Sequence, residues 1–378
     1  MLDRIETHEN VAESTLVDRL LDAGAVHPMI EPGGATVFGL NDVTVVTPHL
    51  GGRASTDGRL IIDDGSNPPI VGASLRLERN RGPAAARNAA RPLVTTSLIA
   101  FVDADVDLLD QLGCGSWLTP LLAHFDDPQV GLVAPRVRGE PTSQLDLGDE
   151  PGRIRAGTRL SYVPAAAIVV RAEAFDGVGG FDEMLRLGED VDLVWRLDDA
   201  GWSCRYEPAS MVWHEPRASM RGRLRQHSGY GSSAAPLSIR HPRSLAPFRS
   251  NRWTAVTYLL ALAGHPLAAI GVGIGSAAAL VPKLPDLPPV TAVRLAATGH
   301  LAAAGQLASA VRRVWWPLVI TAAIVSRRAR LVAVGAMLFA PASTLTDMAY
   351  GVGVWRGVVR HRTIRPLLPD IHRSSNTR

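Results

Sequence analysis

The stretch that decides the fold is L-I-A-F-V-D-A-D-V, residues 98–106. Five apolar residues followed by polar ones predict a buried strand of a parallel sheet. Side chains alternate along a strand, so Asp103 and Asp105 point to the same side where the strand ends. Two partly buried carboxylates at this position lower the stability of the fold unless a cation compensates their charge. Mg²⁺ is usually held by carboxylates together with phosphate oxygens. We expect a divalent-metal and diphosphate site; the alternative is a polar strand exit in which Asp103 caps a turn.

Composition limits the protein classes that the chain can belong to. Its 378 residues allow one large domain with an appendage, or two domains. The two cysteines, Cys114 and Cys204, provide no disulfide framework and suit a reducing cytosol. The residues from Met1 to Asn10 have no apolar core, so we expect no signal peptide. The basic excess is arginine, and the apolar, basic C-terminal third favours a membrane surface over nucleic acid as a partner.

Strands alternate with helices between Val43 and His214, which predicts an α/β fold with a mostly parallel sheet. Residues 42–250 form the expected α/β domain, preceded by a short helix (Glu13–Ala23) and linker in residues 1–41. The predicted strands are Val43–Pro48, Leu60–Asp63, Ser74–Leu77, Leu98–Val102, Val130–Pro135, Ala165–Val170, Trp202–Glu207 and Met211–Trp213. Ligands of such folds bind at the carboxyl ends of the strands.

The connection from His49 to Arg59 is unusual. Parallel strands need a crossover of a dozen or more residues, usually a helix. This segment contains L-G-G-R-A-S-T-D-G and is too short and too glycine-rich for one.

Two predicted helices carry charged residues that could bind a ligand. Asn80–Ala90 begins with Pro83 in its first turn and carries Arg87, a candidate anion site at a helix N-terminus. The alternative is an alanine-rich packing helix with a solvated Arg87. Leu187–Leu197 carries Glu189 and Asp190 in its first turn, where the helix dipole alone would favour carboxylates. Asp192 and Asp198 are expected to be solvated.

Two common nucleotide-binding signatures are missing. No Gly-x-Gly-x-x-Gly follows the first strand, which argues against a dinucleotide-binding oxidoreductase. The sequence also contains no Gly-Lys-Ser/Thr, which argues against a P-loop enzyme.

The C-terminal region, residues 251–378, is expected to be helical and to associate with a membrane. Trp253–Val281 is long enough to span a bilayer, but His265-Pro266 could split it into a hairpin. Thr291–Ala310 is amphipathic, and Val314–Val325 is too short to span. Arginines and Trp315-Trp316 flank that last run, which suits interfacial helices. The alternative is a buried helical subdomain.

Four motifs occur in a fixed order. Asp63-Asp64-Gly-Ser follows a strand, N-R-G-x-x-x-A-R-N begins at Asn80, Asp-x-Asp ends the next strand, and Gly-Glu-Asp opens a later helix. Gly179-Gly180-Phe181-Asp182-Glu183 precedes the last motif. From Val43 to Trp213 this pattern resembles the inverting family-2 glycosyltransferases of the GT-A fold. The runs 312–317 and 346–357 look like those of the mycofactocin-system glycosyltransferases.

The resemblance and the chemistry of transfer suggest a role for each motif. Asp105 would hold Mg²⁺ or Mn²⁺ against the departing diphosphate, with His214 as a candidate third ligand or diphosphate contact. Asp190 would take the proton of the acceptor hydroxyl, and Glu189 would help to shape the acceptor site. The expected donor-binding residues are Asp63, Asp64 (uracil), Asn80, Arg87 and Asp103 (ribose), and those on the acceptor side are Gly180, Phe181 and Asp182.

The resemblance also implies a substrate pair. The implied donor is a nucleotide sugar, UDP-glucose, and the implied acceptor is the peptide-derived premycofactocin. The implied product is a short β-1,4-glucan, made at the cytoplasmic face of the membrane. Two alternatives stay open: a truncated or degenerate homologue without turnover, and a nucleotidylyltransferase. The family has a helix between the first strand and Asp-Asp-Gly-Ser, and the segment His49–Arg59 is too short for it. The resemblance therefore implies that one face of the sheet is uncovered beside the expected uridine pocket.

Overall fold

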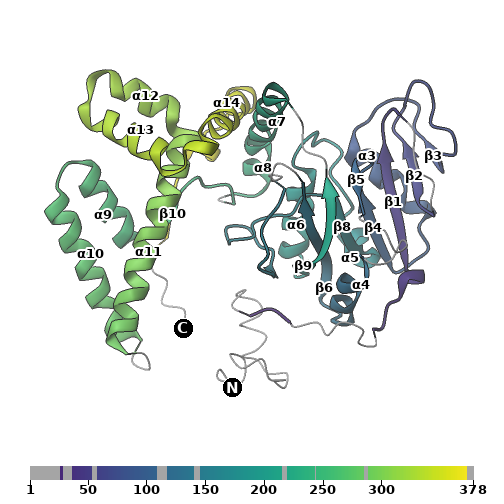
Figure 1. Cartoon of the computed structure of the whole chain (residues 1–378), viewed down its shortest axis with the longest axis horizontal. Helices are drawn as coiled ribbons and strands as arrows, with labels where there is room; N and C mark the ends of the chain where they lie inside the picture. The colour runs from purple at the N-terminus through teal and green to yellow at the C-terminus, as the bar shows by residue number, and fades with distance from the viewer. Residues whose placement is uncertain are drawn as a thin grey trace. The chain divides into compact units, whose positions relative to one another are not determined.

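The computed structural model describes residues 26–28, 36–52, 58–108, 117–139, 145–214, 219–242, 244–284 and 288–372. The chain forms two compact units, Met1–Pro216 and Arg217–Arg378, and each is described by itself (Figure 1). The boundary that we expected at residue 250 falls inside the second unit, because the helices after Arg217 pack there. The predicted helix Glu13–Ala23 lies outside the described residues.

A nine-stranded mixed sheet forms the first unit, in the order β3-β2-β1-β4-β8-β6-β9-β5, with β7 also paired to β9. Six of these strands (β1, β2, β3, β4, β6 and β9) run the same way, so the mostly parallel sheet is confirmed. The bounds are β1 Val43–His49, β2 Leu60–Asp63, β3 Leu75–Arg76, β4 Leu98–Val102, β5 Val106–Asp107, β6 Val130–Arg138, β7 Gly152–Arg153, β8 Ala167–Arg171 and β9 Ser203–His214.

The apolar run Leu98–Val102 forms β4, and every residue of the strand is buried. β4 pairs with β1 on one side in parallel and with β8 on the other in antiparallel orientation. Its side chains contribute to the hydrophobic core together with Leu121, Phe125 and Val169. A strand buried on both faces explains why this run lacks any polar alternation.

We predicted two strands where the structure has one. The segments Trp202–Glu207 and Met211–Trp213 are joined in the single strand β9, because β6 pairs along both of them. The register shifts between Pro135 and Arg136 of β6, where β9 advances from Glu207 to Met211. This irregularity is a bulge, which apolar periodicity does not reveal.

Helices α3 (Pro83–Ala89), α4 (Thr119–Leu122), α5 (Ala172–Gly177) and α6 (Glu189–Asp199) pack against this sheet. Two 3₁₀ turns, η2 (Arg91–Leu93) and η3 (Ala123–Asp126), follow α3 and α4. Pro83 stands in the first turn of α3, as predicted, where a missing N–H costs nothing. α3 contacts β1 and β2, which places Arg87 beside the central strands.

The short connection between β1 and β2 does not expose the second strand. β1 and β2 pair in parallel, and residues 50–52 and 58–59 of the connection are not helical. Ile61 and Ile62 point to opposite faces, yet they are only 1% and 0% exposed. The uncovered face that we expected is therefore wrong for β2.

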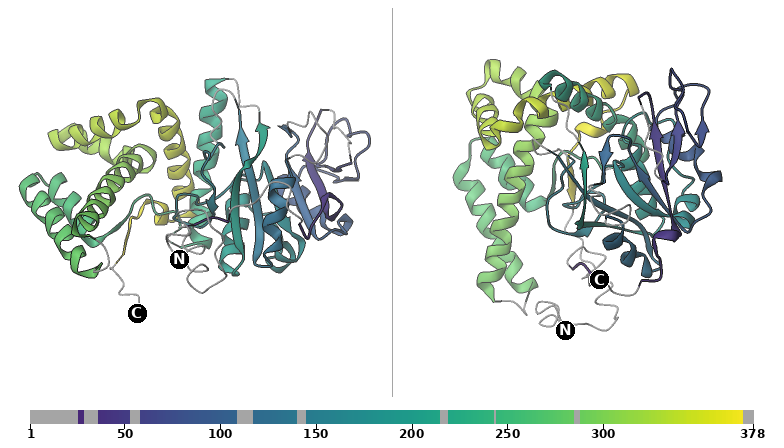
Figure 2. Two further views of the ribbon diagram at one scale, coloured as in Figure 1. Left: turned by 60° about the horizontal axis from the view of Figure 1, so that its bottom comes forward. Right: turned by 45° about the vertical axis from the view of Figure 1, so that its right-hand side comes forward.

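The second unit is mostly helical (Figure 2). Its elements are α7 Met220–Ser232, α8 Ala234–Arg240, β10 Arg249–Asn251, α9 Arg252–Leu262, α10 Pro266–Leu280, α11 Pro289–Ala310, η5 Val311–Trp315, α12 Trp316–Val325, α13 Arg327–Phe339, α14 Thr344–His361 and β11 Asp370–His372. α7 packs against α14 through glycines: a Cβ on Gly231 would overlap the carbonyl oxygen of Tyr350.

Within the described residues of this unit, two helices are long and apolar enough to cross a membrane, and a third span would result if the pair bent by 95° at Ala340 acted as one. His265-Pro266 separates α9 from α10, which confirms the predicted break. Val314–Val325 is not a short helix of its own. It continues from α11 through the π-helical turn η5, so that Pro289–Val325 is one helix of 37 residues.

Candidate active site

The predicted site residues meet at one edge of the sheet. β2, β4 and β9 run in the same direction, so their carboxyl ends lie at that edge. Asp64, Asp103 and His214 stand at these three ends. The location agrees with the rule for open α/β sheets, in which ligands bind where the strands end.

Arg87 is the centre of the site. Its side chain is 2% exposed and donates to Asp103 Oδ1 at 2.6 Å and to Glu189 Oε1 at 3.0 Å. The guanidinium also lies over the ring of Phe181, 5.1 Å from the centroid. Arginine suits this position because its planar fork can serve two carboxylates at once. The solvated Arg87 of the alternative interpretation is thereby excluded.

Burial sets the charge balance of this network. It raises the pKa of Asp103, and the charges of Asp105 and Glu189 raise it further, whereas Arg87 lowers it. Burial and the charge of Asp190 likewise raise the pKa of Glu189, again against Arg87. The carboxylates in turn hold the pKa of Arg87 above its ordinary value in spite of its burial. One cation thus keeps two crowded carboxylates in place.

Asp190 lies next to this network at the start of α6. Gly188 precedes the helix in a left-handed conformation (φ 84°), which turns the chain into α6. The carboxylate accepts hydrogen bonds from Val191 N at 2.8 Å and Ala165 N at 3.3 Å. Burial raises the pKa of Asp190, and these hydrogen bonds and Arg87 only oppose that effect. A carboxylate with a raised pKa at the edge of a site is suited to accept a proton.

Asp105 and His214 are brought together by a strand that sequence patterns did not predict. β5 pairs with the end of β9, with Val106 opposite His214. As a result His214 Nε2 lies 3.3 Å from Asp105 Oδ2. The Asp105 side chain is 70% exposed and that of His214 is 14% exposed, so an incoming ligand can reach the pair. One carboxylate and one imidazole suit Mn²⁺ or a similar divalent ion.

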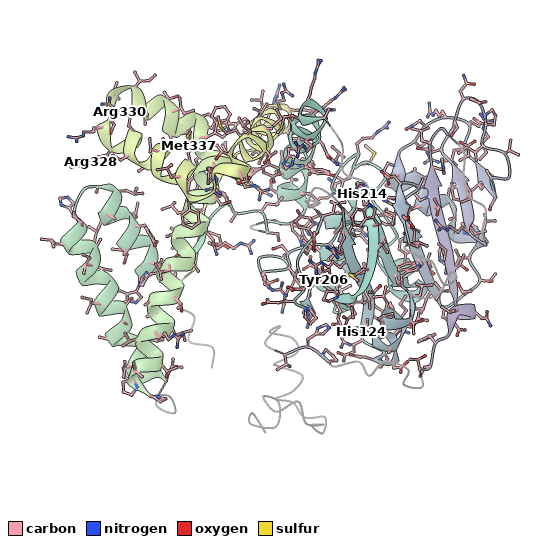
Figure 3. The ribbon with its side chains drawn as sticks, in the orientation of Figure 1. His124, Tyr206, His214, Arg328, Arg330 and Met337 are labelled. Atoms are coloured by element: carbon pink, nitrogen blue, oxygen red, sulfur yellow. The ribbon has the colours of Figure 1, made fainter. Side chains whose placement is uncertain are left out.

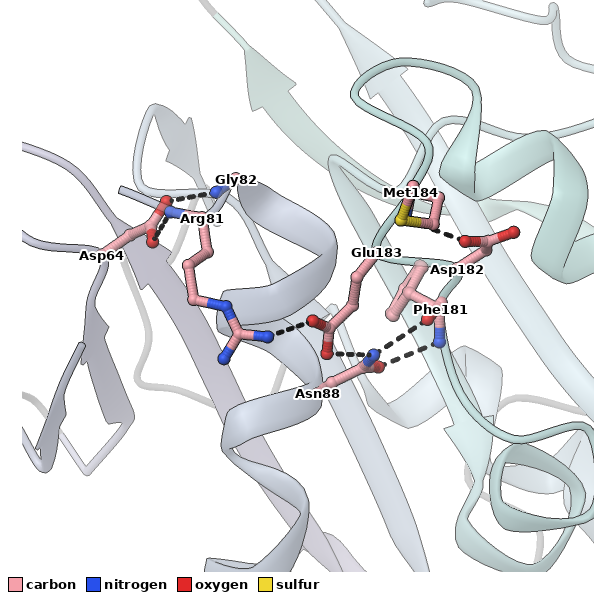
Figure 4. Close-up of polar contacts among 8 residues, drawn as sticks. All are labelled: Asp64, Arg81, Gly82, Asn88, Phe181, Asp182, Glu183 and Met184. Atoms are coloured by element: carbon pink, nitrogen blue, oxygen red, sulfur yellow. Dashed lines mark hydrogen bonds and ion pairs between the residues drawn. The ribbon is translucent and has the colours of Figure 1, made fainter. Parts of the chain in front are cut away.

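Asp63 and Asp64 shape the turn after β2. Asp63 is fully buried and accepts hydrogen bonds from Ser66 N at 2.8 Å and Ile70 N at 3.1 Å. Burial raises its pKa, but these hydrogen bonds and Arg76 bring the pKa below the ordinary value. Asp64 accepts from the backbone N–H groups of Arg81 and Gly82 at 2.7 and 2.8 Å (Figure 4).

The geometry of this turn requires Gly65. Its φ is +74°, and a Cβ would lie 2.6 Å from the nitrogen of Asn80. The side chain of Asn80 is exposed, at the mouth of the loop that leads into α3.

Sequence patterns did not single out Asn88, which organises the expected acceptor side (Figure 4). Its amide donates to Phe181 O at 2.8 Å and accepts from Phe181 N at 2.9 Å. Glu183 contacts both Asn88 and Arg81. Asn88 directly follows Arg87 in the N-R-G-x-x-x-A-R-N motif, which was the available signal.

Asp192 and Asp198 are not solvated, contrary to expectation. Asp192 is 1% exposed and its carboxylate accepts from Arg196 at 2.7 Å. Arg196 in turn donates to the carbonyls of Val178 and Gly180 and so holds the glycine-rich segment before α6. Asp198 pairs with Arg153 at 3.0 Å.

Comparisons with known proteins identify the chain. It is 38% identical to the pre-mycofactocin glycosyltransferase of Mycobacterium tuberculosis over 97% of this chain and 89% of that protein. The succinoglycan biosynthesis protein ExoU of Rhizobium meliloti is 34% identical over 44% of this chain and 50% of that protein. Among solved structures, the mannosyltransferase PcManGT from Pyrobaculum calidifontis in complex with GDP-Man and Mn²⁺ matches with a TM-score of 0.49 and 17% identity, over 92% of this chain and 94% of that one. No protein-family model matches the chain.

The mixed α/β sheet, the acidic edge and these relatives define an enzyme that transfers sugars, a glycosyltransferase. The chain belongs to the pre-mycofactocin glycosyltransferase family, which confirms the resemblance seen in its motifs. The alignment covers 437 positions, 59 more than the 378 residues of this chain, so the relative has segments with no counterpart here.

Proposed function

We propose that this chain transfers glucose from UDP-glucose to a hydroxyl of premycofactocin and extends it into a short β-1,4-glucan. The observation that carries the proposal is the Arg87 network, in which one buried arginine joins Asp103 after β4 to Glu189 at the start of α6. The network joins Asp103, the proposed donor-side carboxylate, to Glu189, which directly precedes the proposed base Asp190. The identity with the Mycobacterium tuberculosis protein supports the choice of acceptor.

The reaction is a single displacement at the anomeric carbon. Asp190 accepts the proton of the acceptor hydroxyl, the oxygen forms a bond to the anomeric carbon, and the bond from that carbon to the diphosphate oxygen breaks. UDP leaves with the bonding electron pair, and one displacement inverts the configuration. One base without a second nucleophilic carboxylate is sufficient for this chemistry.

Asp105 and His214, 3.3 Å apart, would hold a divalent cation, Mg²⁺ or Mn²⁺, and the imidazole nitrogen in the donor set favours Mn²⁺, because Mg²⁺ prefers oxygen ligands. Such an ion neutralises the charge of a departing diphosphate. Asp103 and Arg87 orient the donor from the end of β4, and Asn88 positions the segment Gly180-Phe181-Asp182 toward the acceptor.

The enzyme is proposed to work at the cytoplasmic face of the membrane, with the second unit on or in the bilayer. Helices α10 to α13 expose large apolar side chains, among them Leu267, Ile274, Val325 and Leu338 at 65% or more. Exposed apolar surface on this scale is unusual for a helical unit in water.

The first test is calorimetric binding of UDP to the purified chain with Mn²⁺ and again with a chelator. We expect metal-dependent binding, followed by UDP release and hexose addition to premycofactocin by mass spectrometry. Asp105→Asn should abolish the metal dependence of UDP binding. Binding without turnover on any acceptor would favour the degenerate homologue, whereas turnover of a nucleoside triphosphate with a sugar phosphate would favour the nucleotidylyltransferase.

A further inference from the structure

A second cluster of metal-ligand side chains lies away from the candidate active site. His27, His124 and Glu207 come from three segments: the described residues 26–28, the turn η3 and strand β9. One ligand atom of each lies within 4.8 Å of the others. Figure 3 shows His124 and His214 toward opposite ends of the sheet, so this cluster is separate from Asp105 and His214.

The distances within the cluster suit ligands around one ion. Glu207 Oε2 lies 3.0 Å from His124 Nε2 and 3.7 Å from His27 Nε2. Two ligands of a tetrahedral Zn²⁺ with bonds of 2.0–2.1 Å are about 3.3 Å apart, which falls between these values. The other oxygen of Glu207 accepts from Ala209 N at 2.9 Å. Such a hydrogen bond orients a carboxylate ligand.

Two buried imidazole nitrogens of the cluster have no hydrogen-bond partner among the described residues, His27 Nε2 and His124 Nδ1, and an ion bound between the side chains would satisfy the first. His124 could donate to Glu207 as an ordinary buried pair, but 3.7 Å is too long for a hydrogen bond from His27. His27 Nε2 is buried and has no hydrogen-bond partner among the described residues. A buried imidazole nitrogen that faces a carboxylate oxygen and a second imidazole is satisfied by a cation bound between them.

We propose that His27, His124 and Glu207 form a structural site for Zn²⁺ or a similar transition-metal ion. Two imidazoles and one carboxylate are a donor set that Zn²⁺ accepts, with water in the fourth position. The side chains are 12%, 0% and 10% exposed, which leaves little room for a substrate. The ion would join residues 26–28 to η3 and β9, at the end of the sheet away from the sugar-transfer chemistry.

The test measures metal content in the full chain, purified with a tag that contains no histidine. After equilibration with Zn²⁺ and removal of free metal, we expect one zinc per chain by mass spectrometry in the wild type and in Asp105→Asn. His27→Gln should lose this zinc, and added Zn²⁺ should raise the Tm of the wild type but not of this variant. His361→Gln changes an exposed histidine of α14 and should keep the zinc.

His27→Gln is the decisive variant, because His27 belongs neither to the sheet nor to its hydrophobic core, so its replacement leaves both intact. His124→Gln should also lose the zinc, and circular dichroism shows whether it folds. A metal-free wild type would overturn the proposal. So would zinc that persists in His27→Gln but disappears in Asp105→Asn, since that result would assign the ion to the active-site pair.

Discussion

At the scale of single residues, Asp190 combines a functional advantage with a cost in stability. An acid whose pKa is higher in the folded state binds its proton more tightly there, so folding becomes less favourable as the pH rises from the unfolded-state pKa through the folded-state pKa. Burial raises the pKa of Asp190 above 3.8, so its ionised form destabilises the native state at neutral pH. The same raised pKa makes the carboxylate a better base.

Asp190→Asn should therefore lower the transfer rate by about 10²- to 10⁴-fold, the usual contribution of general base catalysis, and spare UDP binding. At neutral pH its Tm should equal or exceed that of the wild type, and the difference should shrink as the pH falls toward 4. In the wild type, kcat/KM should decrease as the pH falls through the raised pKa. Calorimetry and pH-rate profiles measure these effects, and retained turnover in Asp190→Asn would exclude Asp190 as the base.

The Arg87 side chain is only 2% exposed and pairs with two carboxylates, Asp103 and Glu189. Arg87→Ala would leave Asp103 and Glu189 crowded without their shared cation. Breaking a buried ion pair in this way costs about 3–5 kcal/mol. Arg91 provides the matched control, because it pairs with Asp176 at 2.6 Å but both side chains are about a third or more exposed. Arg91→Ala should cost only about 0–1 kcal/mol.

Urea unfolding of the two variants followed by tryptophan fluorescence compares these free energies. Equal costs for Arg87→Ala and Arg91→Ala would contradict the central structural role of Arg87.

At the scale of elements, the glycine-rich segment before α6 offers a pair of variants. Gly179 and Gly180 both have left-handed backbones, with φ of +76° and +70°, so an added Cβ strains both. Only at Gly180 would the Cβ also lie 2.7 Å from Asn88 Oδ1. Gly180→Ala should thus displace Phe181 and raise the KM for the acceptor beyond the effect of Gly179→Ala. Similar kinetics for both variants would mean that Asn88 does not position this segment.

The contact of α7 with α14 depends on glycine for a different reason. Gly353 lies on α14, and a Cβ there would overlap the carbonyl oxygen of Ser228 and lie 2.9 Å from Gly231 Cα. Gly353→Ala should therefore force the helices apart and lower the Tm of the second unit in detergent. At Gly335 in α13 an added Cβ would have no heavy atom within 4 Å, so Gly335→Ala should stabilise the folded protein by about 0.4–1 kcal/mol. A Gly353→Ala protein as stable as wild type would show that the helices can separate without cost.

At the scale of the whole chain, charge is divided unevenly. Residues 217–378 contain 20 arginines and Lys283 against three aspartates, a net charge of +18, whereas residues 1–216 carry −15. Since anionic lipid attracts basic segments, the second unit is suited to a negatively charged membrane surface.

Vesicles test this association. We expect the chain to float with vesicles that contain anionic lipid, and less with neutral ones. Raising the salt from 0.1 to 1 M shortens the Debye length from about 10 to about 3 Å and should reduce capture without abolishing it, because apolar side chains also contribute. The double variant Arg327→Gln/Arg330→Gln should weaken binding to anionic vesicles alone. Flotation that is independent of both lipid charge and salt concentration would rule out an electrostatic contribution to membrane binding.

Local patterns predicted the features that depend on neighbouring residues. The apolar run of β4, Pro83 at the start of α3 and the break at His265-Pro266 all follow from short-range chemistry. The association of Arg87 with Glu189 depends on residues 102 apart, and only the order of known motifs suggested it.

Features set by tertiary packing escaped prediction. The burial of Asp192, the joining of two segments into β9 and the meeting of His27 with Glu207 have no local signal. The unit boundary was misplaced because α7 carries polar residues typical of a surface helix, although it packs on α14.

The position of β8 has a consequence for synthesis of the chain. β8 lies between β4 and β6, yet it begins 65 residues after β4 ends. At 5–20 residues per second a ribosome needs about 3 to 13 seconds to make that interval. During this time one edge of the fully apolar β4 is unpaired, and such an edge invites aggregation. The nascent chain is thus an expected client for a chaperone that shields extended apolar segments until Ala167–Arg171 has emerged.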